Sequence, residues 1–315
     1  MKGWKPAIWT VLALALPLQT LAQGNSLLWE MTGNGTKQPS YLFGTMHLPD
    51  ERLFLFGDSV MAKLERSEAV AGELVLDMSD MSSLFQLMNV MMMTETTLKE
   101  LISAEDYAKV QAAAMEKLGP MGAMLVDRVK PMFLSMMLMN PSDNQQMDLA
   151  MTDSLQVMDM YFQEVGKRQG KPVYGLETVE EQMAAIDAIP LKEQAQMLVE
   201  SLEETGTDVA SSDAFQQLFD SYLRQDLSEL AGLLKEDGLG ANFNESLVIH
   251  RNKVMAHRID SIAGFTSCFY AIGALHLPGP EGLVNLLRQE GYRVEPVYSP
   301  FGFEKGTITY AGEWY

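Results

Sequence analysis

The sequence predicts an α/β fold with one mixed, partly parallel sheet that is discontinuous in sequence and carries a large Met-rich helical insertion. Short apolar, strand-like runs occur in three places, at about 25–80, 170–180 and 265–300. The residues between them have apolar positions at helical spacing. No low-complexity linker separates these parts, so we expect a single domain over 23–315.

The first 22 residues are typical of a cleaved secretory signal peptide. Two lysines make the start positive, 8–18 is an apolar run broken at two positions, and Thr20-Leu21-Ala22 supplies small residues before a cleavage site. The run is shorter than the ~20 residues that span a bilayer, which favours cleavage over a retained anchor. We expect a periplasmic or secreted protein with no transmembrane anchor after cleavage.

The charge balance excludes some classes of partner. The formal charge is −19, and removal of the two N-terminal lysines makes it about −21. Such acidity disfavours nucleic acid and anionic lipid and is compatible with divalent cations. Cys268 is the single cysteine and cannot form an internal disulfide, so stability must come from the core or from a bound metal.

The start of the mature chain predicts a β-α-β unit. Strands are expected at 27–31 and 41–43, on either side of the turn signal Gly33-Asn34-Gly35. A helix is expected over 58–68, and alternating apolar residues predict a strand over 73–77. The strands on either side of that helix should be parallel.

The rest of the chain predicts mostly helices. The Met-rich insertion covers about 81–168, with Ser103 at a helix start and Gly119-Pro120 as a stop. A strand over 172–177 is followed by further helices over about 179–264. A final strand, helix and strand are expected at 268–276, 280–290 and 293–298.

Two short segments near opposite ends of the chain share one pattern, Gly-x-x-His-Leu-Pro. They are Gly44-Thr45-Met46-His47-Leu48-Pro49 and Gly273-Ala274-Leu275-His276-Leu277-Pro278. Each follows a strand-like run, so each histidine should lie at the carboxyl edge of the sheet, where open α/β sheets bind ligands. A lone histidine after a strand is usually a packed residue. Because only four histidines occur and two share this context, the pattern predicts a shared two-histidine site.

Acidic residues follow the predicted strands of the same edge. Glu73, expected beside the strand that ends at His47, is the natural third ligand, and Asp77 competes for that role. Two imidazoles and a carboxylate commonly bind Zn²⁺, Mn²⁺ or Fe²⁺. A surface ion pair is the alternative for Glu73. Glu177 lies where a strand gives way to a helix, so capping that helix and taking part in catalysis are both open.

Arg251 is the basic candidate, on a helix expected over 245–261. It could bind a substrate carboxylate or stabilise an oxyanion, and a solvated helix face is the alternative. His250 and His257 share the helix seven positions apart, which is not the i, i+4 spacing of a helical metal pair. We expect these two histidines to be structural.

In their order along the chain, these motifs resemble the TraB/GumN family, which includes the Tiki metalloproteases. The resemblance covers essentially the whole mature chain and rests on segments at 41–47, 175–182, 251–255 and 273–282. It implies that the histidines at 47 and 276 bind a divalent metal ion such as Mn²⁺, Co²⁺ or Zn²⁺. It also places Glu73 on the family's acidic strand and matches Glu177 and Arg251 to recurrent polar positions.

Together these observations predict an exported metal-dependent hydrolase, with a peptide or protein as its substrate. His47, His276 and Glu73 would hold the ion, and Glu73 or Glu177 would serve as general base if it is not itself a ligand. Arg251 would orient the substrate or stabilise the oxyanion. The alternative is a non-enzymatic periplasmic accessory protein that binds a metal or haem on the same fold.

Overall fold

The computed structural model describes residues 25–46, 51–75, 85, 88–139, 158–205, 213–236 and 244–302. The predicted signal peptide lies outside these residues, as do His47 and Asp77.

The described chain forms one six-stranded sheet with the strand order β4-β3-β5-β2-β1-β6. Strands β2, β3, β4 and β5 run parallel to one another, and β1 pairs antiparallel with both β2 and β6. The predicted mixed α/β fold is therefore confirmed. The strand bounds are Leu28–Gly33 (β1), Ser40–Thr45 (β2), Ala69–Gly72 (β3), Val173–Gly175 (β4), Cys268–Gly273 (β5) and Tyr292–Val297 (β6).

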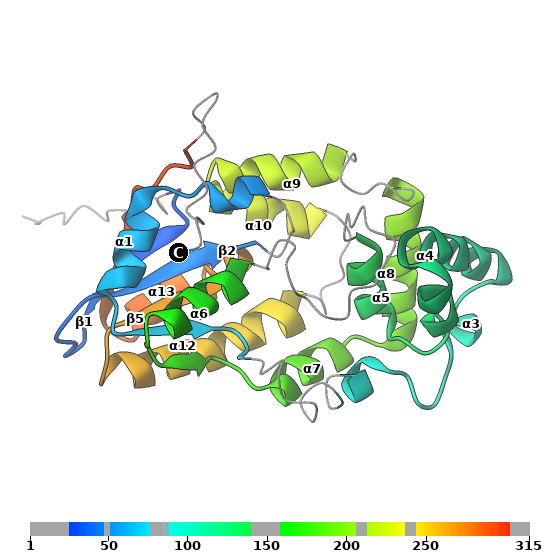
Figure 1. The fold of residues 1–315 in the computed structure, drawn as a ribbon, viewed down its shortest axis with the longest axis horizontal. Helices are drawn as coiled ribbons and strands as arrows, with labels where there is room; N and C mark the ends of the chain where they lie inside the picture. Colours follow the sequence, from blue (N-terminus) through cyan, green and yellow to red (C-terminus); the bar gives the residue numbers. More distant parts are fainter. Residues whose placement is uncertain are drawn as a thin grey trace, which may run out of the picture.

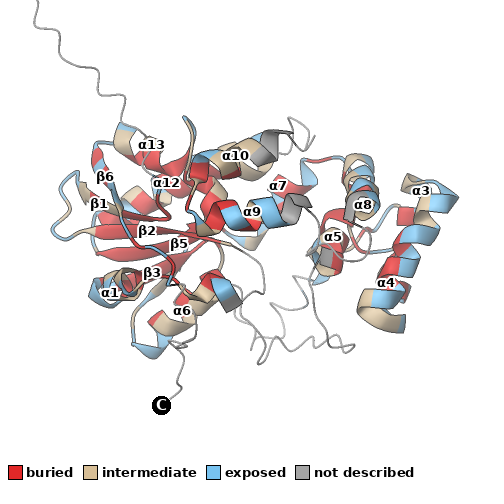
Figure 2. Cartoon of the chain, turned by 90° about the horizontal axis from the view of Figure 1, so that it is seen from above, coloured by how far each residue is buried: buried red, intermediate tan, exposed pale blue. Residues whose placement is uncertain are grey.

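Helices cover both faces of this sheet (Figure 2). On one face, α6 packs on the sheet, and the ring of its Phe162 lies 5.3 Å from that of Phe43 on β2 and 5.2 Å from that of Phe269 on β5. On the other face, the hydroxyl of Tyr270 on β5 donates to the Ile259 carbonyl of α12 at 3.2 Å. The helices around the sheet are α1 (Asp58–Arg66), α6 (Met158–Arg168), α9 (Asp213–Leu223), α10 (Leu227–Glu236), α12 (His250–Ala263) and α13 (Leu283–Gln289).

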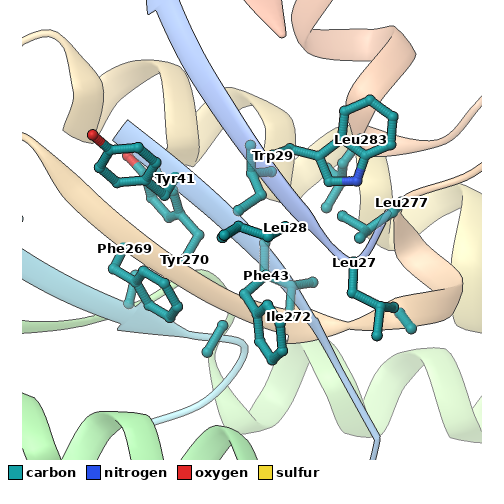
Figure 3. Close-up of a cluster of buried hydrophobic side chains, with 14 of the residues drawn as sticks. Leu27, Leu28, Trp29, Tyr41, Phe43, Phe269, Tyr270, Ile272, Leu277 and Leu283 are labelled. Atoms are coloured by element: carbon teal, nitrogen blue, oxygen red, sulfur yellow. The ribbon is translucent and has the colours of Figure 1, made fainter. Parts of the chain in front are cut away.

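Burial on both faces explains why the central strands are mostly apolar. Every residue of β2 and β3 is buried, as are the first five residues of β5. Parallel strands between two helical layers have this continuous pattern in place of alternation. Figure 3 shows the resulting core, in which Phe43 of β2 and Phe269 of β5 stack with their ring centroids 6.3 Å apart.

The position of β3 corrects the predicted strand over 73–77. The strand is Ala69–Gly72, and Glu73 follows it instead of beginning it. The run Ala69-Val70-Ala71 was missed because it is short, small and buried on both faces, so it has no alternation. The prediction that this strand lies beside β2, the strand that leads to His47, was also wrong, because β5 lies between β2 and β3. Strand β3 therefore pairs with β5 and β4, the strands that lead to His276 and Glu177.

A second group of helices forms its own apolar cluster, away from the sheet (Figure 1). The cluster is built from Met93, Leu98, Phe133 and other residues of the methionine-rich region, together with Met183 and Leu198. The helices are α3 (Leu98–Leu101), α4 (Ala104–Leu125), α5 (Pro131–Met139), α7 (Val179–Asp187) and α8 (Leu191–Thr205). This grouping differs from the predicted insertion over 81–168, since α6 packs on the sheet and α8 joins the second cluster.

Two local sequence signals in α4 agree with the structure. Ser103 caps the helix, accepting a hydrogen bond from the Asp106 amide at 3.1 Å, as predicted. Gly119 ends the first helical segment, as predicted, with φ 69° and ψ −169°, and a second helical segment of α4 begins at Pro120. Proline suits the first position of a helical segment because its amide would have no partner there. No helix in the described ranges has both the length and the apolar character needed to cross a bilayer.

Candidate functional site

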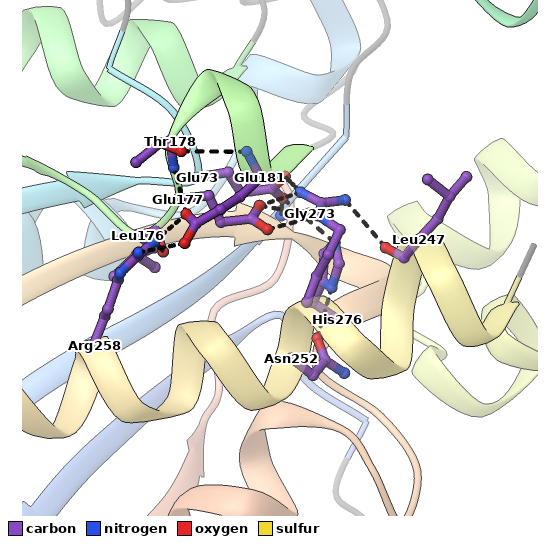
Figure 4. A network of polar contacts seen from close by, with 11 residues as sticks. Glu73, Leu176, Glu177, Thr178, Glu181, Leu247, Asn252, Arg258, Gly273 and His276 are labelled. Carbon is purple, nitrogen blue, oxygen red and sulfur yellow. Dashed lines mark hydrogen bonds and ion pairs between the residues drawn. The ribbon is translucent and has the colours of Figure 1, made fainter. Parts of the chain in front are cut away.

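Four of the residues singled out from sequence converge at the carboxyl edge of the parallel strands, and Figure 4 shows Glu73, Glu177 and His276 among them. Glu73 follows β3, and Glu177 comes two residues after β4. His276 ends η4 (Ala274–His276), the short 3-10 turn that follows β5. Arg251 lies in the first turn of α12, directly after the π-helical turn η3 (Glu245–Ile249). Parallel strands bring these segments to one edge because their carboxyl ends point the same way.

The guanidinium of Arg251 joins the two carboxylates. Its Nε lies 3.0 Å from both Glu177 oxygens, and its Nη2 lies 2.5 Å from Glu177 Oε2 and 2.5 Å from Glu73 Oε2. Its Nη1 donates to the Leu247 carbonyl of η3 at 3.1 Å. The donors of Arg251 are thus directed at the protein's own acceptors, and we expect its main role to be holding Glu73 and Glu177 in place.

The other oxygen of Glu73 faces the turn that carries His276. Glu73 Oε1 accepts a 2.7 Å hydrogen bond from the Gly273 amide and lies 3.7 Å from His276 Nε2. A Cβ added at Gly273 would lie 3.0 Å from Glu73 Oε1 and 3.4 Å from His276 Cδ2. Glycine at 273 therefore allows the carboxylate to approach the backbone closely.

The imidazole of His276 is held from its other side. Its Nδ1 lies 2.6 Å from Asn252 Oδ1, and Asn252 Nδ2 donates to the Glu281 carbonyl at 2.7 Å. The contact of Asn252 with His276 was not predicted from the sequence. Asn252 follows Arg251 directly and belongs to the segment 251–255 that resembles the family, but neither signal indicates a contact with His276, because neighbouring positions on a helix normally point in different directions.

The charged groups of the site are buried. The exposed fractions are 4% for Glu73, 6% for Glu177, 8% for Arg251 and 5% for His276. Burial raises the pKa of Glu177 despite the opposing hydrogen bonds from Arg251. Burial opposes the charged form of Arg251 too, but its bonds to the two carboxylates raise its pKa above the ordinary value. With all three ionised, two negative charges face one positive charge, so the trio is electrostatically suited to a further cation.

Glu177 does not cap α7, which was the alternative role expected for it; Thr178 does. Thr178 is the N-cap of α7, and its hydroxyl accepts from the Glu181 amide at 3.2 Å while the Glu181 carboxylate accepts from the Thr178 amide at 2.8 Å. Glu181 also forms a two-pronged ion pair with Arg258, at 2.7 Å for each contact. The capping box leaves Glu177 to pair with Arg251.

The described residues supply part of a metal-binding donor set. His276 and Glu73 offer an imidazole nitrogen and a carboxylate oxygen, the donor types that suit Zn²⁺, Mn²⁺ and Co²⁺. The described residues hold no group of three His, Cys, Asp or Glu able to bind a metal. The third expected ligand, His47, follows β2 in the undescribed residues 47–50, and Asp77 is likewise outside the described part. His250 and His257 are exposed on α12 and do not join the cluster.

Comparisons with known proteins show that the chain is similar to proteins named as metalloproteases. The chain is 23% identical over 316 residues to a protein named metalloprotease TIKI2 of Danio rerio, covering 86% of this chain and 61% of that protein. It is 22% identical to metalloprotease TIKI1 of Danio rerio (88% and 64% covered) and 24% identical to metalloprotease TIKI2 of Xenopus tropicalis (88% and 60%). The chain thus spans less than two thirds of the length of these relatives.

The same comparisons identify the family. No solved structure matches the chain significantly. The model of the TraB/PrgY/gumN family matches residues 27–296, a range that includes every residue of the candidate site and all of the sheet except Val297. The chain belongs to the TraB/PrgY/gumN family.

Proposed function

We propose that this protein is an exported, metal-dependent hydrolase that cleaves peptide bonds. The observation that carries the proposal is the buried cluster in which Arg251 joins Glu73 and Glu177 beside His276. The names of the Tiki relatives support the class of reaction. The signal-like sequence at 1–22 supports export to the periplasm or the medium.

The cluster supports a functional role over a purely structural one. Buried ion pairs seldom stabilise a fold more than apolar residues of the same volume, because the charges must lose their water. Here two carboxylates and a guanidinium from three separate segments are buried together. The carboxyl edge of a parallel sheet is where such folds bind ligands, and clusters of buried ionisable groups are enriched in functional sites.

We assign the metal-binding positions to His47, His276 and Glu73. A divalent ion bound there would lower the pKa of a water molecule and polarise the scissile carbonyl. Glu73 is assigned as the ligand carboxylate because its Oε1 faces the His276 ring, whereas both oxygens of Glu177 contact Arg251.

Glu177 and Arg251 then act as positioning residues. The side chain of Glu177 is 1% exposed, so it is poorly placed to take a proton from water. The Glu177 carboxylate accepts hydrogen bonds from one side of the Arg251 guanidinium and holds it in place. The guanidinium in turn donates to Glu73 Oε2. The Gly273 amide fixes the second oxygen of the same carboxylate.

The test combines metal analysis with a peptide-library cleavage assay on purified protein. We expect the wild type to contain a stoichiometric divalent ion and to cleave a subset of peptides. The variants His276→Ala, His47→Ala and Glu73→Gln should lose both metal and cleavage. His257→Ala is the matched control, because His257 is exposed on α12 and should retain both properties.

Three results would count against the proposal. Wild-type protein that binds no divalent ion would remove the metal centre, and cleavage that survives in His276→Ala would place the chemistry elsewhere. Stoichiometric metal without any turnover across the library would favour the alternative, a metal-binding accessory protein.

A further inference from the structure

We propose that Asn252 is a positioning residue that fixes His276 as its Nδ1–H tautomer and so turns the Nε2 lone pair toward Glu73. The statement about the tautomer stands on geometry alone. Its consequence for metal binding rests on the proposed function.

The orientation of the Asn252 amide follows from its two contacts. Its Nδ2 lies 2.7 Å from the Glu281 carbonyl, which can only accept, so the amide nitrogen must be on that side. The amide oxygen is therefore on the side of His276, 2.6 Å from Nδ1. An amide oxygen has no hydrogen to donate, so the hydrogen of this contact must belong to Nδ1.

The tautomer of His276 follows from that hydrogen. A neutral imidazole carries one N–H, so protonation at Nδ1 leaves the lone pair on Nε2. His276 Nε2 is the ring nitrogen that faces Glu73 Oε1, at 3.7 Å. Metal-binding histidines commonly donate their other ring N–H to an oxygen, which fixes both the tautomer and the ring plane.

The surroundings of Asn252 make the contact rigid. The residue is 1% exposed, and α12 holds it one position after Arg251. The carbonyl that it contacts belongs to Glu281, in the turn before α13. One helical turn of α12 thus positions Glu73 and Glu177 through Arg251 and His276 through Asn252 (Figure 4).

The test is the tautomer of His276, measured by NMR on full-length ¹⁵N-histidine-labelled protein freed of metal by a chelator. The chain has four histidines, so the signals can be separated, and His276→Gln identifies the one that matters. At about pH 8 we expect the ring proton of His276 on Nδ1, with Nε2 unprotonated. A wild-type ring proton on Nε2 would overturn the proposal, and this measurement requires no variant at 252.

Variants at 252 separate positioning from a general structural effect. Asn252→Leu keeps similar volume but removes the acceptor, so the proton should move toward Nε2. Asn252→Asp keeps an acceptor oxygen and should retain the proton on Nδ1. Asn285→Leu is the matched control, because Asn285 also donates to a backbone carbonyl, that of Pro280 at 2.7 Å, but has no contact with His276. An unchanged tautomer in folded Asn252→Leu would contradict the assignment.

A second measurement links the tautomer to the metal site. Titration of the metal-free protein with Zn²⁺ alone should show affinity about 10- to 100-fold weaker in Asn252→Leu than in wild type, the usual loss for such a supporting residue. Asn252→Asp and Asn285→Leu should bind more tightly than Asn252→Leu. If wild type binds no Zn²⁺ but shows the Nδ1–H tautomer, the proposed function fails while the role of Asn252 stands.

Discussion

The guanidinium of Arg251 meets the carboxylate of Glu177 side-on, with Nε 3.0 Å from Oε1 and Nη2 2.5 Å from Oε2. The two residues are 74 positions apart in the chain, one at the start of α12 and one beyond β4. Two parallel contacts of this kind fix direction as well as distance. Glu73 is then held by the same Nη2, so the Arg251–Glu177 pair determines where the carboxylate beside His276 lies.

Replacing Arg251 should strongly destabilise the fold. Arg251→Met removes the cation from two buried carboxylates, and breaking a buried pair in this way typically costs about 3–5 kcal/mol of unfolding free energy. Urea denaturation measures the loss. Arg258→Met is the control, because its pair with Glu181 is partly exposed and should cost only about 1 kcal/mol. Equal losses in the two variants would show that burial of the Arg251 cluster has no special energetic role.

A methyl group at position 273 should disturb the site more than the fold. In Gly273→Ala the new Cβ would lie 3.0 Å from Glu73 Oε1, so the carboxylate must shift. The carboxylate has to move by only a few tenths of an ångström, so we expect a loss of activity well below the roughly 100-fold that a displacement of about 1 Å can cause. Metal affinity and peptide cleavage measure the effect. Gly232→Ala in α10 is the control, since its Cβ would contact nothing within 4 Å and should stabilise the helix by about 0.5–1 kcal/mol. Normal metal affinity and cleavage in Gly273→Ala would contradict the expected crowding.

The hydroxyl of Tyr222 should stabilise the end of β2. It donates to the Gly44 carbonyl at 2.7 Å and contacts the Met158 sulfur at 3.4 Å, and the residue is fully buried. Tyr222→Phe leaves the buried Gly44 carbonyl without this donor, which should cost about 1–3 kcal/mol in denaturant unfolding. Tyr298→Phe, at an 84% exposed residue, should change stability by less than about 0.5 kcal/mol. A Tyr222→Phe protein as stable as wild type would mean that another group replaces the hydroxyl.

The capping box of α7 should give a stability contribution that disappears in acid. Hydrogen bonds from Arg258 and from the Thr178 amide lower the pKa of Glu181 to about 2, from 4.5. Because the pKa of Glu181 is lower in the folded than in the unfolded protein, its ionised carboxylate stabilises the fold above pH 4.5. This stabilisation is lost as the pH falls through about 2. Glu181→Gln should therefore be less stable than wild type at neutral pH, by less than about 1 kcal/mol because the pair is partly exposed. The difference in stability between wild type and Glu181→Gln should vanish near pH 2.

Unfolding curves of wild type and Glu181→Gln across this pH range check the expectation. Thr178→Ala is the control, because a hydroxyl does not titrate in that range and its loss should weaken the helix cap at every pH. A Glu181→Gln difference that does not change with pH would show that charge is not the source of the contribution.

Local sequence patterns were sufficient to locate five of the six strands and the start of α4. The strands near 28, 40, 173, 268 and 292 and the cap at Ser103 follow short-range apolar patterns, turn residues and hydrogen-bonding side chains. The sequence also indicated that Glu73, Glu177, Arg251 and His276 carry chemistry, and the structure places these four together. For His47, in the undescribed residues 47–50, the metal-binding role stays a prediction.

The order of the strands and the contacts of Asn252 were decided only by the tertiary structure. Strand β3 is four small or apolar residues, and its place between β4 and β5 depends on burial against helices far away in the chain. Asn252 could be recognised as a partner of His276 only when α12 was placed against the turn after β5. The sequence by itself determined which residue types stand at the ends of strands, because those signals are local. Which of them meet depends on long-range packing, because contacts across 24 to 200 positions form only when both helical layers close on the sheet.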